Sequence, residues 1–167
     1  MYLESPSHYV AEAPDRALLY LSLHLLMDGL IQRQRALQCV ENYSVRNALG
    51  KLLRLHRSMS MRLVDILQLD MQHVDQWPSL KQIVTSLPTG AQRRYSHTQR
   101  LLENSGESTY IESDDLARPE HILVGWLRYA CSIFCSPRLK ALVADMIAAW
   151  QICLEGINSE LLTAEPR

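Results

Sequence analysis

The sequence predicts an all-α protein, namely an antiparallel four-helix bundle with one or two extra short helices. Apolar residues recur at helical spacings of three and four over several long stretches. No alternating run of polar and apolar residues typical of a β-strand is present. The 167 residues, 47% of them hydrophobic, suffice for the core of one domain. We expect a single bundle domain over residues 14–163, preceded by a flexible arm over residues 1–13 that lacks the periodicity.

The first two helices are predicted as a hairpin, with arms over residues 14–42 and 44–70. Asp15 falls in the first turn of the first arm, where a carboxylate complements the positive end of the helix dipole. Gly29 interrupts that arm at a cost of about 1 kcal/mol relative to Ala, which indicates either close packing or simple tolerance. Ser44 is a candidate N-cap of the second arm. The short connection forces the two arms to lie antiparallel.

A short helix and a polar helix are predicted after the hairpin. Pro78 suits the first turn of the short helix, and the polar helix spans residues 91–104. Residues 105–115 are rich in Ser, Glu and Asp, and we expect this loop to be the most mobile part of the chain. The wider acidic segment 103–118 is a candidate for ordering when a partner binds.

Two long helices complete the predicted bundle. The first is capped by Ser113 or Asp114 and runs to Cys135. The second has Ser136 as its N-cap, followed by a proline that suits the first helical turn. Its apolar residues alternate between spacings of three and four as far as Leu161, as is typical of a bundle helix.

Composition narrows the broad class of the protein. The net charge of −1 argues against a nucleic-acid partner. No run of 18 uninterrupted apolar residues exists, so we expect no membrane span. The first residues lack the basic and apolar regions of a signal peptide, so we expect a cytoplasmic protein. Four cysteines lie in apolar helical patterns and are expected to be reduced core residues: Cys39, Cys131, Cys135 and Cys153.

His24, Asp28 and His56 form one candidate metal site. His24 and Asp28 are four residues apart and share a face of the first arm, whereas His56 falls on the inner face of the second arm. Two imidazoles and a carboxylate can bind a transition metal inside a helical bundle. The alternative is that both histidines are hydrogen-bonded core residues and that Asp28 pairs with a neighbouring arginine. On that alternative we expect no cofactor.

Charge is segregated along the chain. Residues 32–62 carry seven basic residues against the single acid Glu41, a local charge of +6. The basic residues are Arg33, Arg35, Arg46, Lys51, Arg54, Arg57 and Arg62. Residues 103–120 carry six acids against Arg118, a local charge of −5. This polarity predicts either a hairpin face that binds an anion or an acidic partner, or an acidic segment that covers the basic face within one molecule or across a dimer.

Residues 25–31, Leu-Leu-Met-Asp-Gly-Leu-Ile, are followed across a short turn by a second long helix. This hairpin resembles the opening hairpin of uncharacterised bacterial members of the ferritin-like four-helix-bundle superfamily. The metal-binding members of that superfamily use inward glutamates and a Glu-x-x-His motif. This chain has no Glu-x-x-His motif, and residues 44–69 contain no glutamate. The resemblance therefore implies the fold and argues against di-iron chemistry.

We interpret the chain as a non-enzymatic helical-bundle protein of interaction or assembly, bacterial in type, which binds a protein partner or self-associates. The sequence contains no Gly-rich phosphate loop and no recognisable catalytic triad motif. One alternative is a metal-binding bundle. Another is a bundle that shelters a small apolar molecule beside Trp126 or Trp150. An exposed apolar stripe on the last helix would favour assembly.

Overall fold

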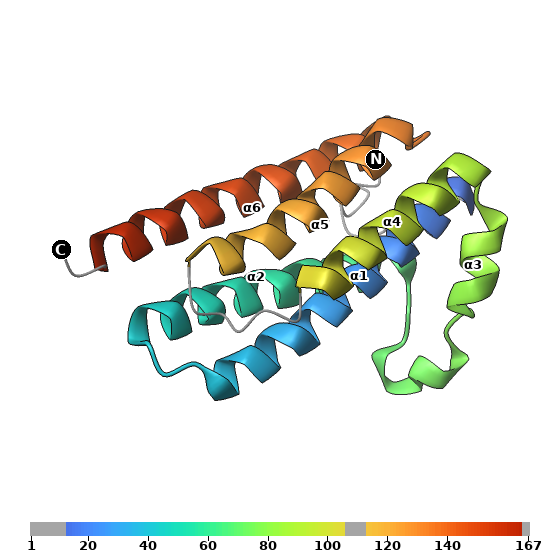
Figure 1. Cartoon of the computed structure of the whole chain (residues 1–167). Helices are drawn as coiled ribbons and strands as arrows, with labels where there is room; N and C mark the ends of the chain where they lie inside the picture. The colour runs from blue at the N-terminus through green and yellow to red at the C-terminus, as the bar shows by residue number, and fades with distance from the viewer. Residues whose placement is uncertain (1–12, 106–112, 165–167) are drawn as a thin grey trace, which may run out of the picture.

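The computed structural model of the chain describes residues 13–105 and 113–164, and these residues form six α-helices and one 3₁₀ helix (Figure 1). The all-α prediction is therefore confirmed for the described residues. Most of the expected N-terminal arm lies outside them. The helices in chain order are α1 (Ala13–Cys39), α2 (Tyr43–Leu67), η1 (Met71–Gln76), α3 (Leu80–Ser86), α4 (Thr89–Ser105), α5 (Ser113–Ile133) and α6 (Pro137–Ala164).

The long helices are arranged as two pairs. α1 packs along α2, and α5 packs along α6. α2 also contacts α6 and α1 contacts α5, so the two pairs face each other across the main hydrophobic core (Figure 1). The polar helix α4 packs on α5, and the short α3 packs on α1. Segments from the two halves of the chain thus share one core.

The hairpin of α1 and α2 agrees with the sequence-based prediction except at its turn and at the end of the second arm, which was expected to reach residue 70. The N-cap of α2 is Asn42 and not Ser44, because the Asn42 side-chain oxygen accepts the N–H of Val45 at 3.2 Å. α2 ends at Leu67, and Gln68 closes it in the left-handed conformation with φ of 52°. Arg16 of α1 donates a hydrogen bond to the Leu67 carbonyl at 2.6 Å, which ties the start of one arm to the end of the other.

The acidic loop before α5 is shorter than expected. α5 begins at Ser113, so residues 113–115 are helical although the sequence predicted a loop to residue 115. The remainder of the expected mobile loop, residues 106–112, lies outside the described residues. Pro119 falls inside α5, within its first two turns. Pro119 is the seventh residue of α5, beyond the first four positions whose N–H groups have no helical partner, so its missing N–H removes one helical hydrogen bond.

The start of α6 is held by a residue from the other end of the chain. Ser136 caps α6 as predicted, since its hydroxyl accepts the N–H of Leu139 at 3.3 Å. The buried Asp15 carboxylate accepts the N–H of Cys135 at 2.8 Å and that of Ser136 at 2.9 Å. Asp15 thus sits in the first turn of its own helix and also completes the corner between α5 and α6.

The expectation that the four cysteines are reduced core residues holds only in part. All four are free thiols, and Cys131 and Cys153 are partly buried and pack against the core, but Cys39 and Cys135 are exposed. Cys39 is the last residue of α1 and Cys135 lies in the turn before α6, where the neighbouring apolar residues no longer share one buried face. An apolar pattern predicts a helix face, but it does not locate the helix end.

We expect Asp15→Ala to lower the free energy of unfolding by about 2–4 kcal/mol, because each hydrogen bond to a charged group contributes about 1.5–3 kcal/mol. Urea unfolding followed by circular dichroism measures the loss. The exposed Asp75→Ala is the control, with a change within about 0.5 kcal/mol. Equal losses in the two variants would contradict a capping role of Asp15.

Candidate functional site

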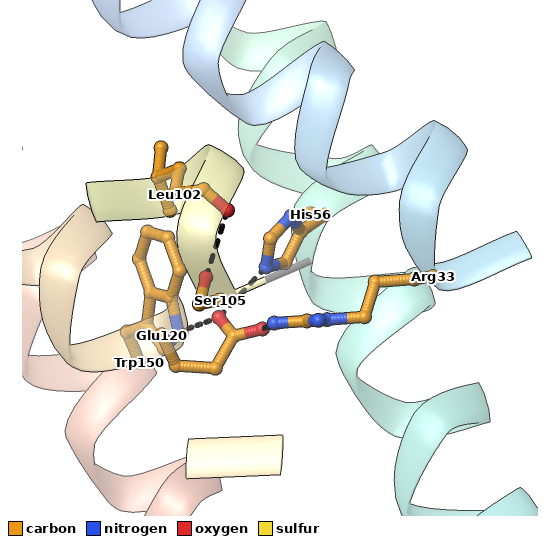
Figure 2. A network of polar contacts seen from close by, with 6 residues as sticks. All are labelled: Arg33, His56, Leu102, Ser105, Glu120 and Trp150. Atoms are coloured by element: carbon orange, nitrogen blue, oxygen red, sulfur yellow. Dashed lines mark hydrogen bonds and ion pairs between the residues drawn. The ribbon is translucent and has the colours of Figure 1, made fainter. Parts of the chain in front are cut away.

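A buried carboxylate, Glu120 of α5, lies where the four long helices meet (Figure 2). It is surrounded by Arg33 from α1, His56 from α2 and Trp150 from α6, and each of these side chains points toward it. Relative exposure is 1% or less for all four residues. We call these four residues the Glu120 cluster. It is the largest concentration of buried polar groups among the described residues.

Each oxygen of the Glu120 carboxylate has two donors. Oε1 accepts from Arg33, whose Nε lies at 2.9 Å and whose Nη2 also donates. Oε2 lies 2.8 Å from His56 Nε2 and accepts the indole N–H of Trp150 at 2.9 Å. An ionised carboxylate only accepts hydrogen bonds, so His56 carries a proton on Nε2. The carboxylate has no remaining lone-pair position for a substrate or a metal ion.

The surroundings keep the Glu120 carboxyl ionised. Burial would raise its pKa, because the charged form loses its hydration. The electrostatic fields of His56 and Arg33, together with their hydrogen bonds, outweigh the burial and lower the pKa from 4.5 to about 2. The Glu120 cluster is therefore a charged network inside an apolar core, and each member depends on the others for compensation.

The second nitrogen of His56 faces the backbone of α1. Nδ1 is buried and has no hydrogen-bond partner within the described part of the chain. A Cβ atom built on Gly29 would lie 3.3 Å from this nitrogen and 3.2 Å from His56 Cε1. The ring also packs edge-on to Trp150, with centroids 5.1 Å apart. A histidine–carboxylate pair acts as a general base when its free nitrogen reaches a substrate, and here that nitrogen is enclosed.

The three predicted metal ligands do not converge. His24 packs edge-on to Tyr20 and near Trp77, on the side of α1 that meets α3. Asp28 is exposed one turn further along. Burial lowers the pKa of His24 and raises the pKa of Asp28, and the charge of each group partly offsets the shift of the other. His56 belongs to the Glu120 cluster. Within residues 13–105 and 113–164, no group of three or more His, Cys, Asp or Glu side chains is placed to hold a metal ion.

The two tryptophans predicted to flank an apolar ligand are packed by protein. Trp126 is buried, donates its indole N–H to Ser22 Oγ at 2.8 Å and contacts Tyr95 edge-on. Trp150 belongs to the Glu120 cluster. A small, partly open cavity of about 60 Å³ lies beside Gly29, where polar side chains contribute to its lining. That volume holds a few water molecules and is well below the size of a typical ligand pocket.

The predicted basic face survives in part. Arg33 does not belong to it, because its side chain is 1% exposed and bonded to Glu120. Lys51 forms an ion pair with Glu160 of α6, and Arg46 donates to the Val40 carbonyl at 3.1 Å. Five of the seven basic residues are exposed and form no ion pair within the described part of the chain: Arg35, Arg46, Arg54, Arg57 and Arg62. The anion-binding or acidic-partner face on these five stays a prediction.

The outer face of α6 carries an apolar stripe, with the exposed charged residues Lys140, Asp145 and Glu155 on or beside it. By length and composition, the segment Pro137–Leu161 qualifies as a candidate membrane span among the described helices, although the sequence was expected to contain none. Core helices of folded domains pass the same test, but they are mostly buried, whereas only 33% of the most apolar window of α6 is buried. The exposed residues include Ala141, Ala144, Ala148 and Ile152. We call this surface the α6 face.

The Glu120 cluster was missed at the sequence level, although one signal for it exists. Glu120 occupies a helical register with Leu116, Leu123 and Leu127, which are all buried. Arg33 occupies a similar register with leucines in α1. A charged residue in an apolar register indicates that it is buried with a partner of opposite charge. Arg33 and Glu120 have opposite charges, so each is a candidate partner for the other. This signal is hidden when Arg33 is counted with the basic segment 32–62 and Glu120 with the acidic segment 103–120.

Stability should depend on pH through Glu120. Its pKa is lower in the folded protein, about 2, than its ordinary value of 4.5. The carboxylate therefore contributes stability fully above 4.5 and loses it as the pH falls through the folded value, a total of about 3 kcal/mol. The Glu120→Gln variant has no carboxylate and lacks this pH-dependent stabilisation. We therefore expect the difference in unfolding free energy between the wild type and this variant to shrink toward pH 2.

Urea unfolding at a series of pH values measures this difference. The exposed Glu103→Gln is the matched control, and its difference from the wild type should stay near zero. A Glu120→Gln difference that is constant over the acid range would contradict the assigned charge state.

Gly29 and Gly50 offer a matched pair of helix-interior glycines. Nothing lies within 4 Å of a Cβ on Gly50, so Gly50→Ala should raise the free energy of unfolding by up to about 1 kcal/mol. Gly29→Ala should not show this gain, because the new methyl group crowds the His56 ring, which Glu120 holds from its other side. Thermal unfolding of both variants tests this expectation, and equal gains would mean that the ring can move aside.

Comparisons with protein-family models, with curated proteins and with solved structures yield no match for this chain. No relative therefore supplies a role for the Glu120 cluster or for the α6 face.

Proposed function

We propose that this protein is a non-enzymatic helical-bundle protein of interaction or assembly, and that the α6 face is its contact surface for a protein partner. The observation that carries the proposal is the mismatch between the composition of α6 and its burial. α6 is apolar enough to be considered as a membrane span, yet two thirds of its most apolar window is not buried.

The α6 face has the physical character of an interface. Ile152 is 70% exposed, and exposed alanines lie one and two turns before it on α6. Burying one such isoleucine fully against a partner contributes about 1.5–3 kcal/mol. Contiguous apolar surface on a folded domain marks interaction sites, whereas single exposed apolar residues are ordinary.

The interior supports the non-enzymatic part of the proposal. Both oxygens of Glu120 are fully used, and the free nitrogen of His56 abuts Gly29. The cluster joins α1, α2, α5 and α6, which suits a role in selecting the arrangement of the helices. Buried polar groups are known to specify register in helical assemblies.

The four-helix bundle and its ferritin-like character belong to the same proposal. Two helix pairs that face each other across one core are what a four-helix bundle requires. The resemblance of the first hairpin to ferritin-like proteins is consistent with this arrangement. The chain has no Glu-x-x-His motif, so the likeness concerns the fold alone.

A photo-crosslinking benzophenone amino acid at position 152, introduced into the protein in intact cells, tests the proposal. We expect one adduct of defined mass, and we expect Ala148→Glu to abolish it, because a charge on the α6 face disrupts apolar contact. The same amino acid at the exposed Gln82 of α3 is the control and should give no adduct. Absence of any adduct from position 152 would count against an interaction role for this face.

A further inference from the structure

We infer that the partner of the α6 face is a second copy of this chain, packed antiparallel across a two-fold axis near Ala148. This inference rests on the proposed function and names its partner. It follows from the order of residues along the α6 face. When two copies of this face lie antiparallel, apolar residues meet apolar residues and acidic residues meet basic ones.

A two-fold axis fixes which residues meet. A residue that follows Ala148 by a given number of positions in one copy lies against the residue that precedes Ala148 by the same number in the other copy. Ile152 then lies against Ala144 of the other copy. Glu155 lies against Ala141, next to Lys140. Every contact is made twice, as an isologous interface requires.

The largest exposed apolar side chain of the face faces a shallow groove in this arrangement. The groove, of about 430 Å³ and widely open to solvent, lies between α5 and α6, and its lining combines apolar residues such as Ala144, Ile147 and Ala148 with polar ones such as Ser132 and Gln151. Ile152 lies outside this groove in its own chain and is 70% exposed. The two-fold arrangement brings Ile152 of one copy to the groove of the other. The alanines allow the two helices to approach closely enough for this insertion, because interaxial distance follows side-chain size.

Charge supports the same orientation. Arg128 and Lys140 also line the groove, and Glu155 lies past Ile152 at the other end of the face. None of these three forms an ion pair among the described residues. The antiparallel arrangement places each Glu155 beside the cationic groove of the other copy. A parallel arrangement would set Glu155 against Glu155 and leave the groove without its isoleucine, so like charges would oppose it.

Light scattering coupled to size-exclusion chromatography of the full chain measures the mass directly. We expect twice the chain mass of 19.1 kDa at micromolar concentration. Ile152→Glu should give the monomer mass and leave the helical circular-dichroism spectrum intact, because position 152 is exposed. Gln82→Glu is the matched control and should remain dimeric.

A charge-reversal pair tests the orientation. Lys140→Glu and Glu155→Lys should each weaken the dimer at least about tenfold, because each places like charges together across the interface. The variant that carries both changes should regain most of the lost affinity. Weakening by both single changes without recovery in the double variant would overturn the antiparallel register.

The crosslink at position 152 separates failure of this inference from failure of the proposed function. An adduct of twice the chain mass, mapped to the peptide around Ala144, supports both. An adduct of another mass keeps the interaction role and overturns the second copy as the partner. A monomer that gives no adduct but floats with phosphatidylcholine vesicles overturns both, and assigns the α6 face to a lipid surface.

Discussion

The Glu120 carboxylate is the contact on which the arrangement of the long helices depends. It receives donors from α1, α2 and α6 at one point, so a shift of any of these helices along its axis would leave a charge buried without a partner. Apolar contacts in the surrounding core tolerate small slips, because hydrophobic burial is not directional. Removing one partner of a buried ion pair costs about 3–5 kcal/mol, which is a large fraction of the stability of a domain.

This interior also explains the character of the surface. Arg33 and His56, which the sequence suggested as parts of a binding surface and a metal site, are both buried in the core. Two features of the described surface bear on function: arginines on α1 and α2 that form no ion pair among the described residues, and the α6 face. Both are suited to contact with another macromolecule. Neither presents a set of groups that converges on a small substrate.

The helices could be predicted closely because helical signals are local. Apolar spacing, a capping serine before Pro137 and the proline and glycine positions all act within one or two turns. The Glu120 cluster could not be assembled in this way, because its partners lie 87, 64 and 30 residues from Glu120. Burial of the cysteines was overpredicted for a related reason. Helix periodicity near an end does not say which residues the next helix covers, as the exposure of Cys39 and Cys135 demonstrates.

The separation of Arg33 from Glu120 has a consequence for synthesis on the ribosome. The hairpin of α1 and α2 emerges first, with an arginine on its apolar side whose counter-ion is 87 residues away. At a translation rate of about 5–20 residues per second, roughly 4–17 s pass between the synthesis of Arg33 and that of Glu120. Asp15 waits longer still, since its backbone partners lie 120 and 121 residues ahead. The nascent hairpin must therefore stay open to water, or be shielded by a chaperone, until the second half of the chain arrives.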